Sequence, residues 1–195
     1  EDDFILLTVS KYKNNKPMFH KTKMKKDFGN IDTLAFNKAN INKIAKELLK
    51  TNYGWGGLYG QRDCSSTLMD FFAPFGFALP RNSSQQAKVG TVLELENLTT
   101  EEKKKIIKQK AIPFETLLYK KGHIVLYVGT HNDEIVVLHN TWGIKTKDNG
   151  VEGRFIVGKT IFSNLEFGSE LNNYDKEAEL LKNIVSLNTI TRQKP

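Results

Sequence analysis

The sequence predicts an α+β protein in which a helix packs on an antiparallel β-sheet, preceded by a short β hairpin. Three patterns carry this prediction. The segments "HIVLYVG" and "EIVVLH" flank "THND" as strand, turn and strand. Two stretches show apolar residues at helical spacing. Residues 4–25 contain two strand-like runs around the turn-rich "KNNKP".

Helical periodicity replaces strand periodicity near residue 36. Apolar side chains then recur at positions i, i+3, i+4, i+7 and i+8 of one helix, namely Ile41, Ile44, Ala45, Leu48 and Leu49. We therefore expect two parts, an N-terminal β segment over residues 1–36 and a larger α+β domain over residues 37–195.

The larger part should contain several further elements. A second helix begins at Cys64 after the glycine-rich "YGWGG", and "LPRNSSQQAK" follows as a capped turn or short helix. Thr99 and Glu102 form a capping-box pattern that opens a basic helix, which we expect to be a solvated insertion. "GRFIVGKTIF" is typical of another strand, and the polar tail from Asn172 contains a helical "EAELLKNIV".

Composition disfavours several functional classes. Hydrophobic residues make up 39% and charged residues 26%, and no apolar run approaches the length of a membrane span, so we expect none. The net charge of +7 favours polyanionic partners, but the lysines are scattered and no nucleic-acid motif accompanies them. The first residues show no secretory signal, and position 1 is not methionine, which is typical of a processed chain.

Cys64 is the only cysteine, so it cannot form an intramolecular disulfide. It shares the apolar face of its helix with Leu68, and a lone cysteine in such a place is commonly a core residue. Its position in the first helical turn supports a second interpretation, since the free backbone N–H groups and the helix dipole favour the nucleophilic thiolate. On that interpretation the pKa of the thiol is lowered, and the N–H groups can donate to an oxyanion.

Two histidines are expected close to each other. If "THND" is the turn, mirror pairing about residue 131 or 132 makes His139 a direct or diagonal neighbour of His123 on one sheet face. A cysteine with two imidazoles suits a catalytic triad, in which one ring takes the thiol proton and a third group orients that ring. The set also suits a metal site, but zinc needs three or four ligands and the acidic residues lie at the far, turn end of the hairpin. We therefore expect no metal and no cofactor.

Five blocks occur in the order "YGWGG", "DCSS", "LPRNSSQQA", "GHIVLYVG" and "VVLHNTWG". This order resembles the NlpC family of papain-like cysteine peptidases, which cut bacterial peptidoglycan stem peptides. The resemblance implies a papain-like fold and a periplasmic or secreted cell-wall hydrolase. It also implies cleavage between γ-D-glutamate and a diamino acid, either meso-diaminopimelate or lysine.

By position, the resemblance implies Cys64 as the nucleophile, His123 as the general base and His139 as the third, orienting member of the triad. The residues that it places at the substrate are Tyr53, Asp63, Ser65 and Ser83. A carboxylate beside the thiol opposes thiolate formation, so Asp63 makes better sense as a contact for the substrate's amine. Asp63 is also suited to cap the helix, and the two roles do not exclude each other.

The chain departs from the family pattern in three places. Ser66 stands where glycine is usual, the stretch from residue 91 to 118 is long, and so is the span from His123 to His139, which leaves Asn140 as an alternative third residue. A subgroup with similar blocks carries two amino-terminal Src-homology-3-like barrels, and residues 4–30 would be the last strands of such a barrel. A full barrel does not fit in this stretch.

Two rival functions stay open at this point. One is a papain-like amidase or acyltransferase that acts on another amide or ester, and the other is a non-catalytic peptidoglycan-binding protein. A nucleic-acid partner is disfavoured, and the sequence does not indicate an oligomeric state.

Overall fold

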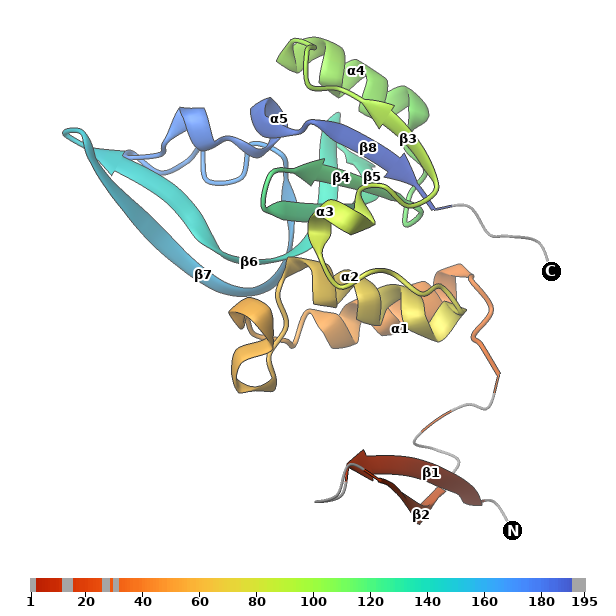
Figure 1. The fold of residues 1–195 in the computed structure, drawn as a ribbon. Coiled ribbons are helices and arrows are strands. Elements are labelled where there is room, and N and C mark those ends of the chain that lie inside the picture. Colours follow the sequence, from red (N-terminus) through yellow and green to blue (C-terminus); the bar gives the residue numbers. More distant parts are fainter. Residues whose placement is uncertain (1–2, 12–15, 26–28, 30–31, 191–195) are drawn as a thin grey trace. The chain divides into compact units, whose positions relative to one another are not determined.

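A computed structural model describes residues 3–11, 16–25, 29 and 32–190 of the chain (Figure 1). The chain forms two compact units, residues 1–35 and residues 36–195. In the first unit, β1 (Asp3–Lys11) and β2 (Pro17–Lys25) pair antiparallel, which confirms the predicted hairpin. Residues 13–15 of the predicted turn lie outside the described residues. The assignment of this segment to a Src-homology-3-like barrel stays a prediction.

The second unit is built on a six-stranded antiparallel sheet with the order β3-β8-β4-β5-β6-β7. The strands are β3 (Thr91–Glu94), β4 (Thr116–Lys120), β5 (His123–His131), β6 (Glu134–Asp148), β7 (Val151–Asn164) and β8 (Ser186–Thr189). The helices are α1 (Lys38–Leu48), α2 (Cys64–Phe72), α3 (Ser83–Gln86), α4 (Thr100–Lys110) and α5 (Leu180–Asn183). This arrangement confirms the predicted α+β class, with α2 packed against β5 and β6.

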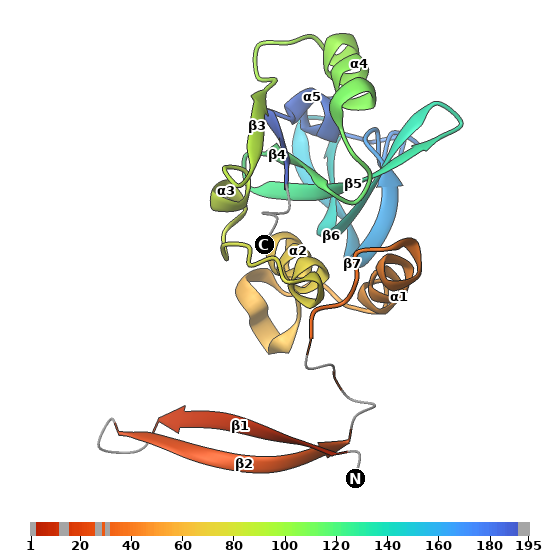
Figure 2. The same ribbon diagram turned by 90° about the vertical axis from the view of Figure 1, so that its right-hand side faces the viewer.

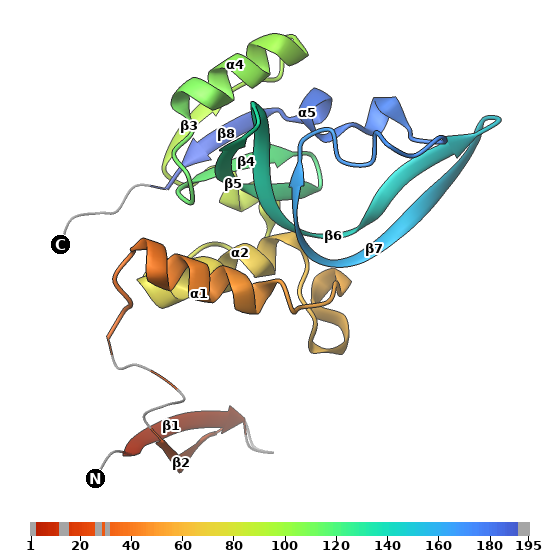
Figure 3. The same ribbon diagram turned by 180° about the vertical axis from the view of Figure 1, so that it is seen from behind.

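Helices cover both faces of the sheet. α1 and α2 lie on one side, whereas α4 and α5 lie on the other (Figures 1 and 2). Ile124 and Val125 of β5 point to opposite faces of the sheet, and both are fully buried because both faces are covered. β6 and β7 continue beyond the other strands as a long two-stranded ribbon (Figure 3).

The insertion between residues 91 and 118 is solvated along only part of its surface, so the predicted solvated insertion is confirmed in part. α4 does begin with the predicted capping box of Thr99 and Glu102. One side of the helix is packed, because Ile107 is fully buried in the hydrophobic cluster with residues of β4, β5 and β8. Lys103 is also buried, and its ammonium donates to the carbonyl oxygen of Lys182 at 2.8 Å.

The polar tail contains a strand that the sequence did not predict. The expected helix over residues 177–185 reduces to α5, and β8 then enters the sheet between β3 and β4. The polar residue Asn188 occupies a fully buried position there, where its amide donates to the carbonyl oxygens of Gln86 and Val89 at 2.9 and 2.8 Å. A buried residue with such partners does not show in a hydrophobic pattern.

The turn between β5 and β6 lies slightly further along the chain than predicted. Asn132 and Asp133 form its centre, and both have the positive φ that two-residue hairpin turns require. The first strand pair is His131 with Glu134, so the turn is centred between residues 132 and 133.

A β-bulge corrects the register before the strands reach the two histidines. If the pairing at the turn continued unchanged, His123 and His139 would point to opposite faces. Val128 is an extra residue on β5, and beyond it Leu126 lies opposite Leu138. The pairing is then symmetric about residue 132, which puts both histidines on one face. The predicted shared face therefore depends on this bulge.

We expect the bulge to depend on Gly129, whose φ of +142° is unfavourable for a residue with a Cβ. No atom lies within 4 Å of a Cβ built at this position, so a side chain would meet backbone strain and no clash. Gly129→Val should lower the free energy of unfolding in urea by about 1–3 kcal/mol. The control Thr130→Val, at the next residue, should change it by less than about 0.5 kcal/mol. Equal effects of the two substitutions would contradict this account of the bulge.

Candidate active site

The start of α2 is fixed by a reciprocal cap. The Asp63 carboxylate accepts from the backbone N–H of Ser66 at 2.9 Å, and the Ser66 hydroxyl accepts from the backbone N–H of Asp63 at 2.9 Å. This confirms that Asp63 caps the helix, and it gives Ser66 a structural use at a position where glycine is usual. Cys64 follows in the first turn and is 9% exposed.

Asp63 also forms an ion pair that sequence reasoning missed. Arg81 donates to both carboxylate oxygens, at 3.0 and 2.6 Å, and the Ser65 hydroxyl donates to one of them at 3.0 Å. Burial raises the pKa of Asp63, but the hydrogen bonds from Arg81, Ser66 and Ser65 outweigh burial and lower the pKa to about 2. A substrate amine at Asp63 would therefore share the carboxylate with a guanidinium.

The expected lowering of the Cys64 pKa is wrong. Burial raises the pKa of the thiol, and the negative charge of Asp63 raises it further. Backbone N–H groups of Ile124, Ser65 and Cys64 itself act in the opposite direction without reversing the shift. The helix start does favour the thiolate, but loss of solvent outweighs that effect, so Cys64 is a neutral thiol at neutral pH.

The predicted substrate residues gather around the thiol. Tyr53, Asp63, Cys64, Ser65 and Ser83 all line one pocket of about 700 Å³, which lies within the usual size range of small-ligand sites. Burial raises the pKa of Tyr53, and nearby Cys64 and Asp63 raise it further, so the phenol stays protonated and able to donate. Arg81 lines the same pocket.

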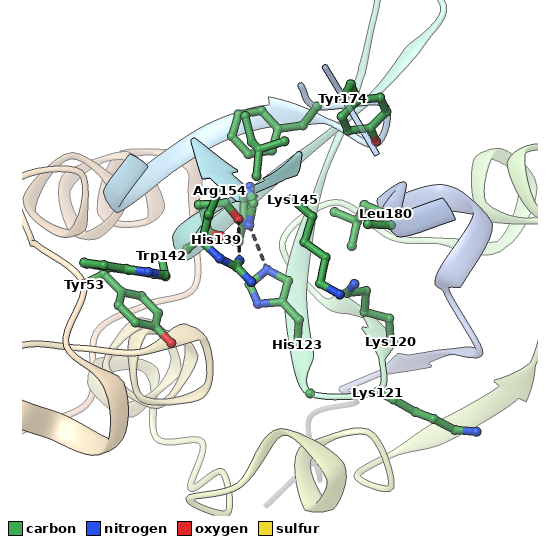
Figure 4. Close-up of a pocket in the computed structure, with 16 residues that line it drawn as sticks. Tyr53, Lys120, Lys121, His123, His139, Trp142, Lys145, Arg154, Tyr174 and Leu180 are labelled. Atoms are coloured by element: carbon green, nitrogen blue, oxygen red, sulfur yellow. Dashed lines mark hydrogen bonds between the residues drawn. The ribbon is translucent and has the colours of Figure 1, made fainter. Parts of the chain in front are cut away.

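The two histidines meet in an adjoining pocket, which shares Tyr53 and Gly122 with the first. Nε2 of His123 lies 2.9 Å from Nδ1 of His139, with the rings edge to face (Figure 4). His123 directly precedes Ile124, whose backbone N–H interacts with the Cys64 sulfur, so the ring and the thiol occupy the same corner. Neither histidine is hydrogen-bonded to Cys64 in the described part of the chain.

His139, and not the alternative Asn140, is the partner of His123. Asn140 is buried and donates instead to the carbonyl oxygens of Asn52 and Arg62, at 3.3 and 3.1 Å. It thus ties the segment before α2 to the sheet.

Both imidazoles are neutral at neutral pH. Burial lowers the pKa of His123, and the charge of Lys120, which lies opposite it on β4, lowers it further, to about 4. Burial also lowers the pKa of His139, with a smaller effect from His123.

A sequence model of the NlpC/P60 family matches residues 50–158, more than half of the chain. The chain belongs to the NlpC/P60 family. The matched range contains all seven residues predicted at the site and ends before the last residues of β7.

Solved structures share the NlpC/P60 fold with this chain. An NlpC/P60 endopeptidase from Photobacterium damselae subsp. piscicida has a TM-score of 0.75 at 24% identity, over 95% of this chain and 46% of that chain. An NlpC/P60 family protein from Bacillus cereus ATCC 10987 has a TM-score of 0.53 at 14% identity, over 98% of this chain and 62% of that chain. The chain thus spans only part of either protein's length. No curated protein gives a significant match.

Hydrogen-bond directions fix the tautomers of this NlpC/P60 site. The Ser163 hydroxyl donates to the carbonyl oxygen of Asn164 at 2.9 Å, so its oxygen must accept at its 3.0 Å contact with Nε2 of His139. A neutral His139 that donates from Nε2 has a lone pair on Nδ1, which then accepts from Nε2–H of His123. A neutral His123 is left with a lone pair on Nδ1, the form that can take a proton.

Sequence reasoning missed Ser163. It lies on β7 opposite Val137 of β6, which places it on the same sheet face as His139. The predicted strand "GRFIVGKTIF" ended one residue earlier, at Phe162. A further irregularity in the pairing of β6 and β7, next to Trp142, also prevents this register from being counted along the sequence.

The described residues contain no group of three or more histidine, cysteine, aspartate or glutamate side chains placed to hold a metal ion. Their helices include none that is long and apolar enough to cross a membrane.

We expect Ser163→Ala to lower kcat about tenfold, equal to about 1.4 kcal/mol of barrier, because His139 would no longer be held in the tautomer that accepts from His123. The measurement is steady-state hydrolysis of peptidoglycan fragments, with KM expected to stay within about twofold since Ser163 lines neither pocket. Ser163→Thr retains the hydroxyl and is the matched control. Equal kcat in wild type and Ser163→Ala would show that the hydroxyl does not matter.

Proposed function

We propose that the chain is a cell-wall cysteine endopeptidase that hydrolyses peptidoglycan stem peptides between γ-D-glutamate and the diamino acid. The observation that carries this proposal is the 2.9 Å hydrogen bond between His123 and His139. It leaves His123 with a basic Nδ1 at the corner of the sheet where Cys64 begins α2. Membership of the NlpC/P60 family supports the substrate class, and the match of the "DCSS" and "GHIVLYVG" blocks supports the roles.

The proposed reaction starts from neutral groups. Cys64 attacks the γ-glutamyl carbonyl carbon while His123 takes the thiol proton at Nδ1, so that the sulfur becomes nucleophilic as it attacks. The resulting imidazolium keeps its hydrogen bond to His139, which orients it. His123 then gives the proton to the leaving amine, and water hydrolyses the thioester with His123 again acting as the base.

When the sulfur attacks, the substrate's carbonyl oxygen becomes negatively charged, and hydrogen-bond donors near the sulfur are needed to stabilise it. The backbone N–H of Cys64 points out of the first turn of α2, where no carbonyl oxygen of the helix can accept from it. Tyr53 has a protonated phenol, and its pKa responds to Cys64, so the two groups are close. We assign these two donors to the oxyanion.

The substrate's acyl part is proposed to occupy the pocket around Cys64. Ser65 and Ser83 offer hydroxyl groups there, and Asp63 is the candidate contact for a free amino terminus. Arg81 must be included in this assignment, because it already holds Asp63 through two hydrogen bonds. A peptidoglycan substrate implies a periplasmic or secreted location, which we propose for this chain.

The test is digestion of purified muropeptides, with the products identified by mass spectrometry. Wild type should release a peptide that begins with the diamino acid and leave L-Ala-γ-D-Glu attached to the muramic acid, and Cys64→Ala should release none because no thioester can form. Circular dichroism should show that the variant is folded. Unchanged cleavage by Cys64→Ala would exclude the mechanism, and binding of sacculi without cleavage by wild type would favour the non-catalytic alternative.

A further inference from the structure

The pocket that contains the histidine pair is strongly basic. Its lining includes Lys120, Lys121, Lys145 and Arg154, and no aspartate or glutamate is among the described residues that line it. Of these four cations, Lys121 is already paired, with Glu96 at 3.4 Å, and its side chain extends away from the histidines (Figure 4). The other three cations have no carboxylate partner within 4.0 Å in the described part of the chain.

These three cations are held close together by the sheet. Lys145 and Arg154 lie directly opposite each other on β6 and β7, an arrangement that is unfavourable for like charges. The side chains of Lys145 and Lys120 converge in the pocket (Figure 4). Burial lowers the pKa of Lys120, and the charges of Lys145 and Arg154 lower it further. An anion bound here would relieve a repulsion that the protein itself leaves uncompensated.

The far wall of the same pocket, around Tyr174, has a negative electrostatic potential. Tyr174 lines it, and burial together with four carboxylates raises the pKa of this phenol to about 12. The carboxylates, in decreasing order of effect, belong to Glu179, Asp175, Glu166 and Glu170. The pocket thus has a positive side next to the histidines and negative potential around Tyr174.

The pocket also lies on a defined side of the scissile bond. The proposed acyl pocket contains Cys64, Asp63 and Ser83, and it meets the basic pocket at Tyr53 and Gly122. A peptide that crosses this boundary with its γ-glutamyl carbonyl at Cys64 places its leaving diamino acid beside His123. The groups at the end of that diamino acid's side chain therefore determine which stem peptides fit.

We propose that this pocket selects stem peptides with meso-diaminopimelate, by binding the carboxylate at the end of its side chain to Lys120, Lys145 and Arg154. The inference rests on the proposed function. A lysine side chain ends in an ammonium alone and would meet three like charges. Diaminopimelate ends in a carboxylate and an ammonium, which suit the basic side and the region around Tyr174 respectively.

Binding of this carboxylate would also act on the base. Lys120 lies opposite His123, and its charge is one of the two causes that weaken that imidazole as a base. A carboxylate at Lys120 offsets this charge and makes His123 more basic when the correct substrate is bound. Recognition of the leaving group therefore contributes to kcat as well as to KM.

The experiment measures how fast the 195-residue chain cleaves each of three synthetic tripeptides. They are L-Ala-γ-D-Glu-meso-diaminopimelate, the same peptide amidated on the side-chain carboxyl, and L-Ala-γ-D-Glu-L-Lys. We expect kcat/KM to be about tenfold higher for the first, and the amidated peptide to behave like the lysine peptide, since a tenfold ratio needs only about 1.4 kcal/mol.

Lys120→Gln and Lys145→Gln should each reduce this preference severalfold. Lys147→Gln, which removes the same charge two residues further along β6 and outside the pocket, should leave it unchanged. Cleavage of all three peptides at equal rates, or an equal effect of Lys147→Gln, would overturn the pocket assignment while leaving the proposed function intact. Cleavage of none would overturn the proposed function, and this inference with it.

Discussion

The hydrogen bond between His123 and His139 is the contact on which the site depends, and much of the fold is arranged to form it. The two rings come from adjacent strands, and they share one face of the sheet only because β5 contains one extra residue. The bulge at Val128 supplies that residue, and Gly129 supports it with a backbone angle that is unfavourable for other residues. Because both rings are neutral, the direction of their hydrogen bond decides which nitrogen of His123 can act as a base.

Electrostatics keep the cysteine and the histidines of the resting site uncharged. Burial raises the pKa of Cys64 and lowers that of His123, so neither group is charged at neutral pH. A preformed thiolate and imidazolium pair is therefore not the resting state. In the mechanism that we propose, proton transfer accompanies attack, and it becomes easier when bound substrate changes the charges around His123. Lys120 is the cation in the best position to transmit such a change.

The sequence allowed Cys64, His123 and His139 to be predicted as one site because each stands in a local pattern. A helix start, a strand and a mirror-paired strand can be recognised without tertiary structure, and family blocks in matching order restrict the roles. The predicted α+β class followed from the same periodicities. β8 was missed since its buried Asn188 is satisfied by distant carbonyl groups, which no local pattern shows.

Other features depend on tertiary contacts that sequence spacing does not encode. Arg81 reaches Asp63 across 18 residues, and Ser163 reaches His139 across 24. The pKa of Cys64 was predicted in the wrong direction because the helix start is visible in the sequence, whereas the burial of the thiol is a result of packing. Counting residues from the turn to the histidines succeeded only because the bulge offsets the position of the turn.

The most direct test of this account is a nitrogen-15 NMR titration of the histidine rings in the folded protein. A depressed pKa means that His123 loses its proton as pH rises through about 4, so both His123 and His139 should be neutral at pH 7. Both should also carry their proton on Nε2, as the hydrogen-bond chain through Ser163 requires. A charged His123 at pH 7, or a proton on Nδ1 of either ring, would contradict the account.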